Sequence, residues 1–174
     1  MFGEKYDHKY KQSADEESDA SDEKARNEQE LFVVEGRKMF QEVPEEWLKQ
    51  VYVSESFFAE NDKMLAGYTY EIVSDSVFKA VSDTQTPQGI LCLVRKPQYR
   101  LEELLKGADT HLLILESIQD PGNLGTMLRT GEGAGISGVV MNHTTVDLFN
   151  PKTIRSTMGS IYRMPFFVTR DLAE

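Results

Sequence analysis

The stretch HLLILESIQDPGNLGTMLRT, residues 111–130, decides the fold because it joins an apolar strand to the start of a helix. Its apolar run, residues 112–115, is typical of a strand that is buried on both faces of a parallel sheet. Asp120 has a side chain that caps helices, and Pro121 suits the first helical turn. The order strand, turn, helix predicts an α/β unit whose ligands bind where the strand ends.

The same arrangement recurs towards the carboxyl end of the chain. A second strand is expected over residues 136–141, and a third over residues 164–168. Between them, Asn150 and Pro151 repeat the cap and the proline of the first helix. Because parallel strands need a long crossover that a helix supplies, this order predicts three parallel strands joined by helices.

Three glycines between the first predicted helix and the second strand need a separate interpretation. Gly133, Gly135 and Gly138 match the pattern G-x-G-x-x-G. That fingerprint marks a dinucleotide site only where it follows a strand and opens a helix, and here it follows a helix. The glycines are therefore interpreted as helix termination and close packing of the helix on the sheet.

The amino-terminal half predicts a tail and a second α/β domain. Residues 1–27 contain a dense acidic run without large apolar side chains, which predicts a disordered tail. Beyond it, short β-rich runs alternate with helical spacing at 31–34, 51–54, 68–73 and 90–94. This alternation predicts a small α/β domain over residues 28–97, again with parallel strands. Residues 98–110 are predicted as a linker, and residues 111–174 as the second domain.

Composition excludes several classes of protein. The 174 residues carry a net charge of −10, one cysteine and three histidines, so an internal disulfide and a zinc-type ligand cluster are both excluded. No apolar run approaches the length of a membrane span, and a cytoplasmic protein without membrane partners is expected. The acidic average hides a basic region, because residues 148–170 contain Lys and Arg but no Asp or Glu.

Asn123 and Arg129 are the first candidates for chemistry. They lie at and beyond the start of the first predicted helix of the second domain, where Gly122 and Gly125 would let a ligand approach the backbone. Asn123 could orient a ligand through its amide, and Arg129 follows Gly125 by one helical turn. The alternative is that this segment only caps a helix and that Arg129 is a solvated surface charge.

The second candidate is the predicted helix over residues 150–163. Helical spacing places Ile154, Met158 and Ile161 on one apolar stripe. Lys152, Arg155, Ser156 and Gly159 share the opposite side, and Arg163 follows close behind. A free helix amino terminus beside two cations suits a phosphate group. A solvated basic face is the alternative.

These segments resemble the TrmH (SpoU) family of RNA ribose methyltransferases, within the SPOUT class. The run from Asp120 to Thr130 is similar to the first motif of the family, and the run from Asn150 to Gly159 is similar to the block that follows. Residues 24–36, together with Gln88 and Gly89, resemble the amino-terminal substrate domain, a ribosomal-protein-like α/β module that holds RNA. The resemblance implies an RNA-binding α/β domain followed by the first half of a SPOUT parallel-sheet domain.

The resemblance also implies an activity. The family transfers a methyl group from S-adenosylmethionine to a ribose 2′-hydroxyl of ribosomal or transfer RNA. Position in the motifs assigns catalysis to Asn123 and Arg129, and RNA binding is assigned to the basic and polar group Lys152, Arg155, Ser156 and Arg163. Since a guanidinium is a poor proton acceptor near neutral pH, Arg129 is expected to bind a phosphate and stabilise a developing alkoxide.

The later motifs of the family carry further expectations. They comprise a glycine-glutamate-glycine loop and a Ser-Leu-Asn-Val segment, and neither occurs before Glu174. The second domain is therefore expected to be incomplete at its carboxyl end, with the cofactor-binding residues outside this sequence. Family members are commonly dimers, so a homodimer is expected for the full-length protein. The alternative hypothesis is a truncated, inactive remnant that binds RNA.

Overall fold

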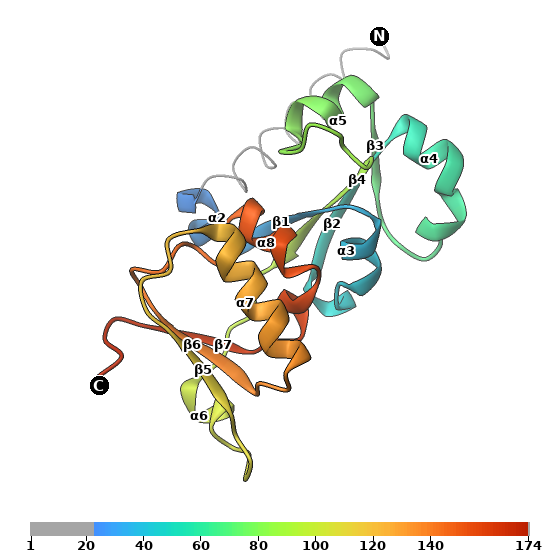
Figure 1. Ribbon diagram of the computed structural model, residues 1–174. Helices are drawn as coiled ribbons and strands as arrows, with labels where there is room; N and C mark the ends of the chain where they lie inside the picture. Colours follow the sequence, from blue (N-terminus) through green and yellow to red (C-terminus); the bar gives the residue numbers. More distant parts are fainter. Residues whose placement is uncertain (1–22, 174) are drawn as a thin grey trace. The chain divides into compact units, whose positions relative to one another are not determined.

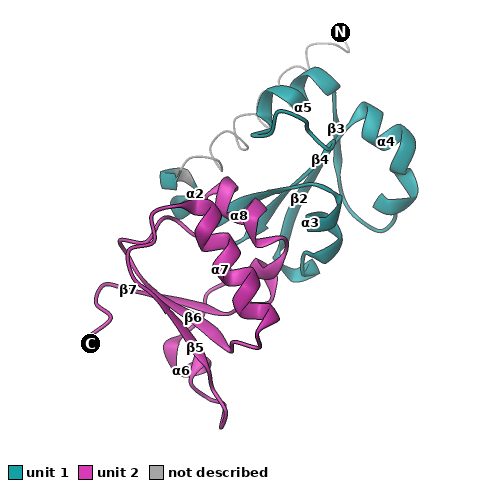
Figure 2. Cartoon of the chain, viewed as in Figure 1, with its two compact units in different colours: residues 1–96 teal, residues 97–174 magenta. Residues whose placement is uncertain are grey.

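The structure is a computed structural model that describes residues 23–173. The chain divides into two compact units, with the boundary between Lys96 and Pro97 (Figure 2). Residues 1–22, most of the predicted acidic tail, lie outside the described residues. The last residues of that predicted tail belong to helix α2 (Glu23–Gln29).

The first unit combines four strands with short helices (Figure 1). Its elements after α2 are β1 (Leu31–Glu35), α3 (Arg37–Glu42), η1 (Glu45–Trp47), β2 (Leu48–Ser54), α4 (Glu55–Asn61), η2 (Asp62–Leu65), β3 (Glu71–Val73), α5 (Asp75–Val81) and β4 (Ile90–Arg95). The strand order in the sheet is β1-β4-β2-β3. Strands β2 and β3 are parallel, whereas β4 runs antiparallel to both β1 and β2.

The expectation of a wholly parallel first sheet is therefore wrong, because β3 ends and β4 starts at the same edge of the sheet with only α5 and a loop between them. The Glu35 carboxylate at that edge accepts hydrogen bonds from the Ser82 and Thr84 hydroxyls, at 2.7 and 2.9 Å, and from the Gln88 backbone amide at 3.3 Å. These bonds hold the segment after α5 at the edge where β1 ends. Strand β4 starts at that edge and must run in the opposite direction.

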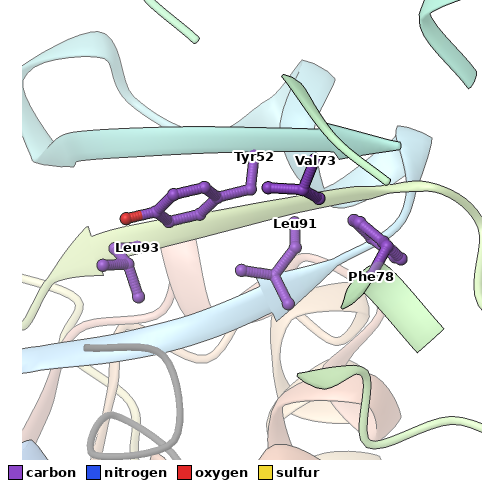
Figure 3. Packing of buried hydrophobic residues seen from close by; sticks show 5 residues of the cluster. All are labelled: Tyr52, Val73, Phe78, Leu91 and Leu93. Atoms are coloured by element: carbon purple, nitrogen blue, oxygen red, sulfur yellow. The ribbon is translucent and has the colours of Figure 1, made fainter. Parts of the chain in front are cut away.

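Alternating side chains of this sheet form a core against α5. Tyr52, Leu91 and Leu93 project from β2 and β4, and Val73 joins them from β3 (Figure 3). Phe78 of α5 closes the cluster, and its side chain is almost fully buried. Ser74 starts α5 by accepting a hydrogen bond from the Val77 amide at 3.3 Å. The cap and the buried phenylalanine together fix where α5 begins and which face it covers.

The second unit is a three-stranded sheet with two principal helices. Its elements are α6 (Leu101–Leu104), β5 (Leu112–Leu115), α7 (Pro121–Gly133), β6 (Gly138–Asn142), α8 (Pro151–Thr157), η3 (Ser160–Tyr162) and β7 (Phe166–Thr169). The strand order is β5-β6-β7 and both pairs are parallel, as the sequence predicts. Helices α7 and α8 lie side by side on one face of this sheet (Figure 1).

The burial of the first strand of this sheet differs from its prediction. Strand β5 is an edge strand, and the side chain of Ile114 is 58% exposed. The central strand, β6, is buried along its whole length. An apolar run predicts a strand, but the position of that strand within the sheet depends on pairing that the run does not encode. No helix within residues 23–173 is long and apolar enough to span a membrane.

Candidate functional site

The site begins where β5 ends and α7 starts. Asp120 is the N-cap of α7: its Oδ1 accepts a hydrogen bond from the Asn123 backbone amide at 2.7 Å, and Pro121 occupies the first turn. The predicted cap is confirmed. The side chain of Asn123 is exposed at this end of the helix. The cap therefore fixes the backbone of Asn123 while its amide side chain stays accessible to a ligand.

Gly125 brings α7 into direct contact with α8. A Cβ atom at this position would lie 2.5 Å from Ser156 Cβ and 2.6 Å from the Thr153 carbonyl oxygen. No side chain other than hydrogen fits such an approach. The interpretation of Gly125 as a site of ligand approach is therefore wrong, because the neighbour that comes close is α8 of the same chain.

Arg129 lies one turn further along α7. Its side chain is exposed, and within residues 23–173 it makes no hydrogen bond or ion pair. An arginine that carries a structural ion pair would be committed to its partner, whereas this guanidinium keeps its donors available. The geometry thus leaves Arg129 open to an external acceptor such as a phosphate.

Lys152 links the two helices at the end where α7 starts. Its ammonium lies 4.0 Å from Asp120 Oδ2, and both side chains are largely exposed. The Lys152 backbone amide donates to Asn150 Oδ1 at 2.9 Å, so the predicted cap of α8 is confirmed. The Asn150 side chain therefore occupies one backbone amide at the amino terminus of α8.

The helix predicted over residues 150–163 is broken. Helix α8 ends at Thr157, Met158 adopts a left-handed conformation with φ 52°, and Gly159 follows with φ 96° before η3 begins. Met158 is 45% exposed, so its predicted place on the apolar stripe is wrong. Ile154 and Ile161 are buried as predicted. The left-handed pair reverses the chain, and helical spacing no longer holds beyond it.

The basic residues do not form one cluster. Arg163 donates to the carboxylate of Glu132, with Nη2 at 3.3 Å from Oε2, near the carboxyl end of α7. Glu132 follows Asn123 by nine residues, about 13 Å along the helix axis. Arg163 is therefore remote from Asn123, whereas Lys152 reaches the N-cap of α7. Residues 148–170 contain no acidic side chain, so that segment alone did not predict these ion pairs. The acidic partners, Asp120 and Glu132, belong to α7 and its cap.

A polar network at the end of β6 escaped the sequence analysis. Asn142 is 9% exposed, and its Oδ1 accepts hydrogen bonds from the Ser117 amide at 2.8 Å and the Thr145 hydroxyl at 2.9 Å. Ser117 has φ 53°, in the left-handed region. Gln119 Nε2 donates to the Thr144 carbonyl oxygen at 2.8 Å. The Val146 amide donates to the Ile118 carbonyl oxygen, also at 2.8 Å.

The effect of this network is to tie the loop after β5 to the loop after β6. The loop after β5 leads directly to Asp120 and α7, so Asn142 fixes the approach to the site. A signal was present in the sequence, since Asn142 ends an apolar strand and precedes two threonines. Within residues 23–173 no group of three or more His, Cys, Asp or Glu could hold a metal ion.

The glycines after α7 terminate the helix as predicted. Gly135 adopts φ 77°, and the Ile136 amide returns to the Gly131 carbonyl oxygen at 2.9 Å. Close packing falls at Gly138 of β6, whose Cβ would lie 2.9 Å from the Leu104 side chain of α6, whereas Gly133 meets no atom within 4 Å. The G-x-G-x-x-G match therefore marks the end of a helix and no dinucleotide site.

Comparison with known proteins identifies this arrangement. The SpoU rRNA methylase family matches residues 110–174, and the MRM3-like substrate-binding domain matches residues 20–92. The two matches divide the chain between them, one in each unit. The chain belongs to the SpoU methylase family. Within that family, its amino-terminal unit is of the MRM3-like substrate-binding type.

Two relatives and two solved structures illustrate the likeness. The chain is 34% identical over 144 residues to the 23S rRNA (guanosine(2553)-2′-O)-methyltransferase RlmP of Bacillus subtilis, and 35% identical over 153 residues to the human mitochondrial rRNA methyltransferase 3. An rRNA methyltransferase from Sinorhizobium meliloti superposes with a TM-score of 0.76 at 25% identity. The fold is shared with AdoMet-bound AviRb from Streptomyces viridochromogenes, with a TM-score of 0.78 at 17% identity.

The matches cover most of this chain but only part of each relative. They include 82% of the chain and 56% of the Bacillus protein, and 80% of the chain and 35% of the human protein. For the solved structures the shares are 90% of the chain and 61% of the Sinorhizobium protein, and 95% of the chain and 64% of AviRb. The activity of the complete relatives is therefore a basis for a proposal about this chain.

Proposed function

We propose that this chain belongs to an RNA 2′-O-methyltransferase that transfers a methyl group from S-adenosylmethionine to a ribose of ribosomal RNA. The observation that carries the proposal is the exposed pair Asn123 and Arg129 on α7, within the segment that matches the SpoU family. The named activity of the Bacillus relative supports the ribose 2′-oxygen as acceptor, and ribosomal RNA as substrate.

In the reaction, the ribose 2′-oxygen would take the methyl group from the sulfonium sulfur, which would keep the electron pair of the broken bond as a thioether, and the hydroxyl proton would pass to solvent water. Arg129 is assigned the phosphate beside the reacting ribose, where its fixed charge also stabilises the developing alkoxide. Asn123 is assigned the orientation of the ribose through its amide. The main contribution of these residues is to hold the oxygen in line with the methyl group.

RNA binding is assigned to the exposed surface next to these two residues. Lys152 and Ser156 face the start of α7, and Arg155 belongs to the same short helix. Arg163 is paired with Glu132 towards the other end of α7, so a phosphate there would have to share its guanidinium with that carboxylate.

S-adenosylmethionine is proposed as methyl donor because it is bound in solved structures of the same fold such as AviRb. At the carboxyl edge of the sheet, the polar groups of Ser117, Asn142 and Thr145 hydrogen-bond to one another. A homodimer and a cytoplasmic location are part of the same proposal, the latter supported by the Bacillus relative.

Methyl transfer to ribosomal RNA tests the proposal. The full-length protein is incubated with protein-free ribosomal RNA and S-adenosylmethionine carrying a labelled methyl group, and the RNA is then hydrolysed with alkali. A 2′-O-methyl group blocks cleavage, so label in alkali-resistant dinucleotides is the expected result. RNA binding without any transfer would overturn the proposal in favour of an inactive RNA-binding protein. Location of the tagged protein in mitochondria would overturn the cytoplasmic assignment.

A further inference from the structure

The first unit contains a cavity that the methyl-transfer proposal does not use. It measures about 310 Å³ and lies at the edge of the sheet where β1 and β2 end and β4 starts. Its walls come from the starts of α3, α4 and α5 and from the loop before β4. The two segments that resemble a substrate domain, residues 24–36 and Gln88–Gly89, meet here although they are far apart in the sequence.

The meeting of these segments depends on Gly36. Its φ is 104°, and a Cβ would lie 2.9 Å from Gln88 Oε1. Gln88 Oε1 accepts a hydrogen bond from the Arg37 backbone amide at 3.2 Å. The Gln88 side-chain NH₂ group has no partner among the described residues, so it is available to donate at the wall of the cavity.

Arg37 and Phe57 form a flat surface in the cavity. The Arg37 guanidinium carbon lies 5.2 Å from the centroid of the Phe57 ring. Phe57 is 4% exposed, whereas the Arg37 side chain is exposed. The aromatic ring therefore supports the guanidinium from below and leaves its plane accessible. Such planes are surfaces on which unstacked RNA bases stack.

Asp75 and Ser56 present hydrogen-bond acceptors in the wall of the cavity. Asp75 Oδ1 accepts from the Ser56 hydroxyl at 2.7 Å and from the Ser56 amide at 3.2 Å. Asp75 Oδ2 takes part in neither bond. The hydroxyl proton of Ser56 is directed at Asp75 and Ser54 Oγ lies 3.1 Å from Ser56 Oγ, so one of the two acceptor positions of the Ser56 oxygen is left for a ligand. Asp75 and Ser56 thus offer two neighbouring acceptors.

The charges of the cavity balance one another. Arg37 and Lys79 are cationic, and Glu60 and Asp75 are anionic. A phosphate would meet as much negative as positive charge here, and a neutral ring with donors on one edge and acceptors on another suits the walls better. The donors of Gln88 and Lys79 and the acceptors of Ser56 and Asp75 define those two edges.

We propose that this cavity binds a single unpaired guanine base of an RNA strand. Guanine has two adjacent donors, N1–H and the N2 amino group, for Asp75 and Ser56. Its O6 and N7 atoms are acceptors for Gln88 and Lys79. Adenine, cytosine and uracil lack two adjacent donors on one edge. This site goes beyond the proposed methyl transfer, since it belongs to the other unit and holds a base that is not methylated there.

Binding of short oligonucleotides to the complete chain tests the proposal. The heptanucleotides UUUGUUU and UUUAUUU, each with a fluorescent label, are titrated with protein and their anisotropy is followed. The guanine-containing strand should bind about tenfold more tightly. Equal affinities would overturn the proposal. Competition by free GMP as strong as that by unlabelled UUUGUUU would also overturn it, because the ligand would then be a free nucleotide.

Matched variants tie the preference to the cavity. Asp75→Asn keeps an oxygen that accepts from Ser56 but replaces the acceptor Oδ2 by an amide donor, so the preference for guanine should disappear. Asp62→Asn is the control, since this exposed carboxylate lies on η2 and accepts only the Lys63 amide among the described residues. A preference that survives in Asp75→Asn would contradict the site. Methyl transfer is not the readout, so failure here leaves the proposed function standing.

Discussion

The two sheets of the protein differ at the edge where their parallel strands end. In the first unit, β4 enters from that edge in the antiparallel direction, and the residues around it leave an open cavity. In the second unit all three strands are parallel, and the loops after β5 and β6 are joined by hydrogen bonds centred on Asn142. One edge is built to admit a ligand, and the other to hold α7 in a fixed position.

Two units with a similar order of strands and helices thus differ at the edge of the sheet where the parallel strands end. The Glu35 side chain holds a loop there by hydrogen bonds in the first unit, and the Asn142 side chain does so in the second. In the first case the gathered loop starts a strand, and in the second it leads to a helix. In each unit a single polar side chain at the end of a strand thus holds a neighbouring loop at that edge.

The largest expected effect comes from Gly125→Val in the second unit. The new side chain would overlap Ser156 and the Thr153 carbonyl oxygen, so α7 and α8 must separate. We expect a loss of about 3 kcal/mol in the free energy of unfolding, measured with urea. Gly133→Ala is the control: it meets no atom within 4 Å and should be neutral or slightly stabilising. Equal losses in both variants would contradict close helix packing.

Asn142→Ala should lower the free energy of unfolding by somewhat less, about 2 kcal/mol, because the Ser117 amide loses its buried acceptor. Amide hydrogen exchange measures the effect locally, and the Ser117 amide should exchange much faster. Asn142→Asp retains the acceptor for Ser117 and Thr145, so its Ser117 amide should stay protected. If Asn142→Ala leaves that amide protected, the network does not hold the loop.

Gly36→Ala tests the edge of the first sheet where β1 ends. We expect the free energy of unfolding to fall by about 1 to 2 kcal/mol. Two costs add: the backbone angle φ of 104° is unfavourable for alanine, and its Cβ would displace Gln88. Gly67→Ala separates them, because Gly67 has φ 90° but meets no atom within 4 Å. Urea unfolding should show the smaller loss for Gly67→Ala. The reverse order would show that Gln88 adapts without cost.

The smallest expected effect is a dependence of stability on pH. The hydrogen bonds from Ser56 lower the pKa of Asp75 below its ordinary value of 3.8. The stabilisation is therefore complete above pH 3.8, and it is lost as the pH falls through the lower pKa of the folded state. The urea midpoints of the wild type and Ser56→Ala, compared from pH 6 to pH 2, should converge at the acid end. A constant difference would contradict the assignment.

Local structure was the part of the fold that the sequence predicted well. Asp120 and Asn150 cap α7 and α8 because a capping side chain and the following proline act within a few residues. The parallel order of β5, β6 and β7 followed from the same short-range pattern. The antiparallel entry of β4 was missed, because it depends on the edge of the sheet that the segment after α5 reaches, and local patterns do not encode that edge.

The candidate site was predicted in part for the same reason. Asn123 and Arg129 are exposed on α7, and Lys152 lies next to the cap of that helix. The roles of Gly125 and Arg163 could not be predicted, since each depends on a partner from another element. Met158 shows a further limit: an apolar residue at helical spacing is buried only if the helix continues, and here a left-handed turn ends it.

The rate of methyl transfer by the Arg129→Ala variant of the full-length protein, with labelled S-adenosylmethionine and saturating ribosomal RNA, tests the role of Arg129 directly. Arg129 is exposed and makes no hydrogen bond or ion pair within residues 23–173, so the urea midpoint should change little. The rate should fall by about 10²-fold, and the control Arg95→Ala, an exposed arginine at the end of β4, should keep its rate. A wild-type rate in Arg129→Ala would contradict the account.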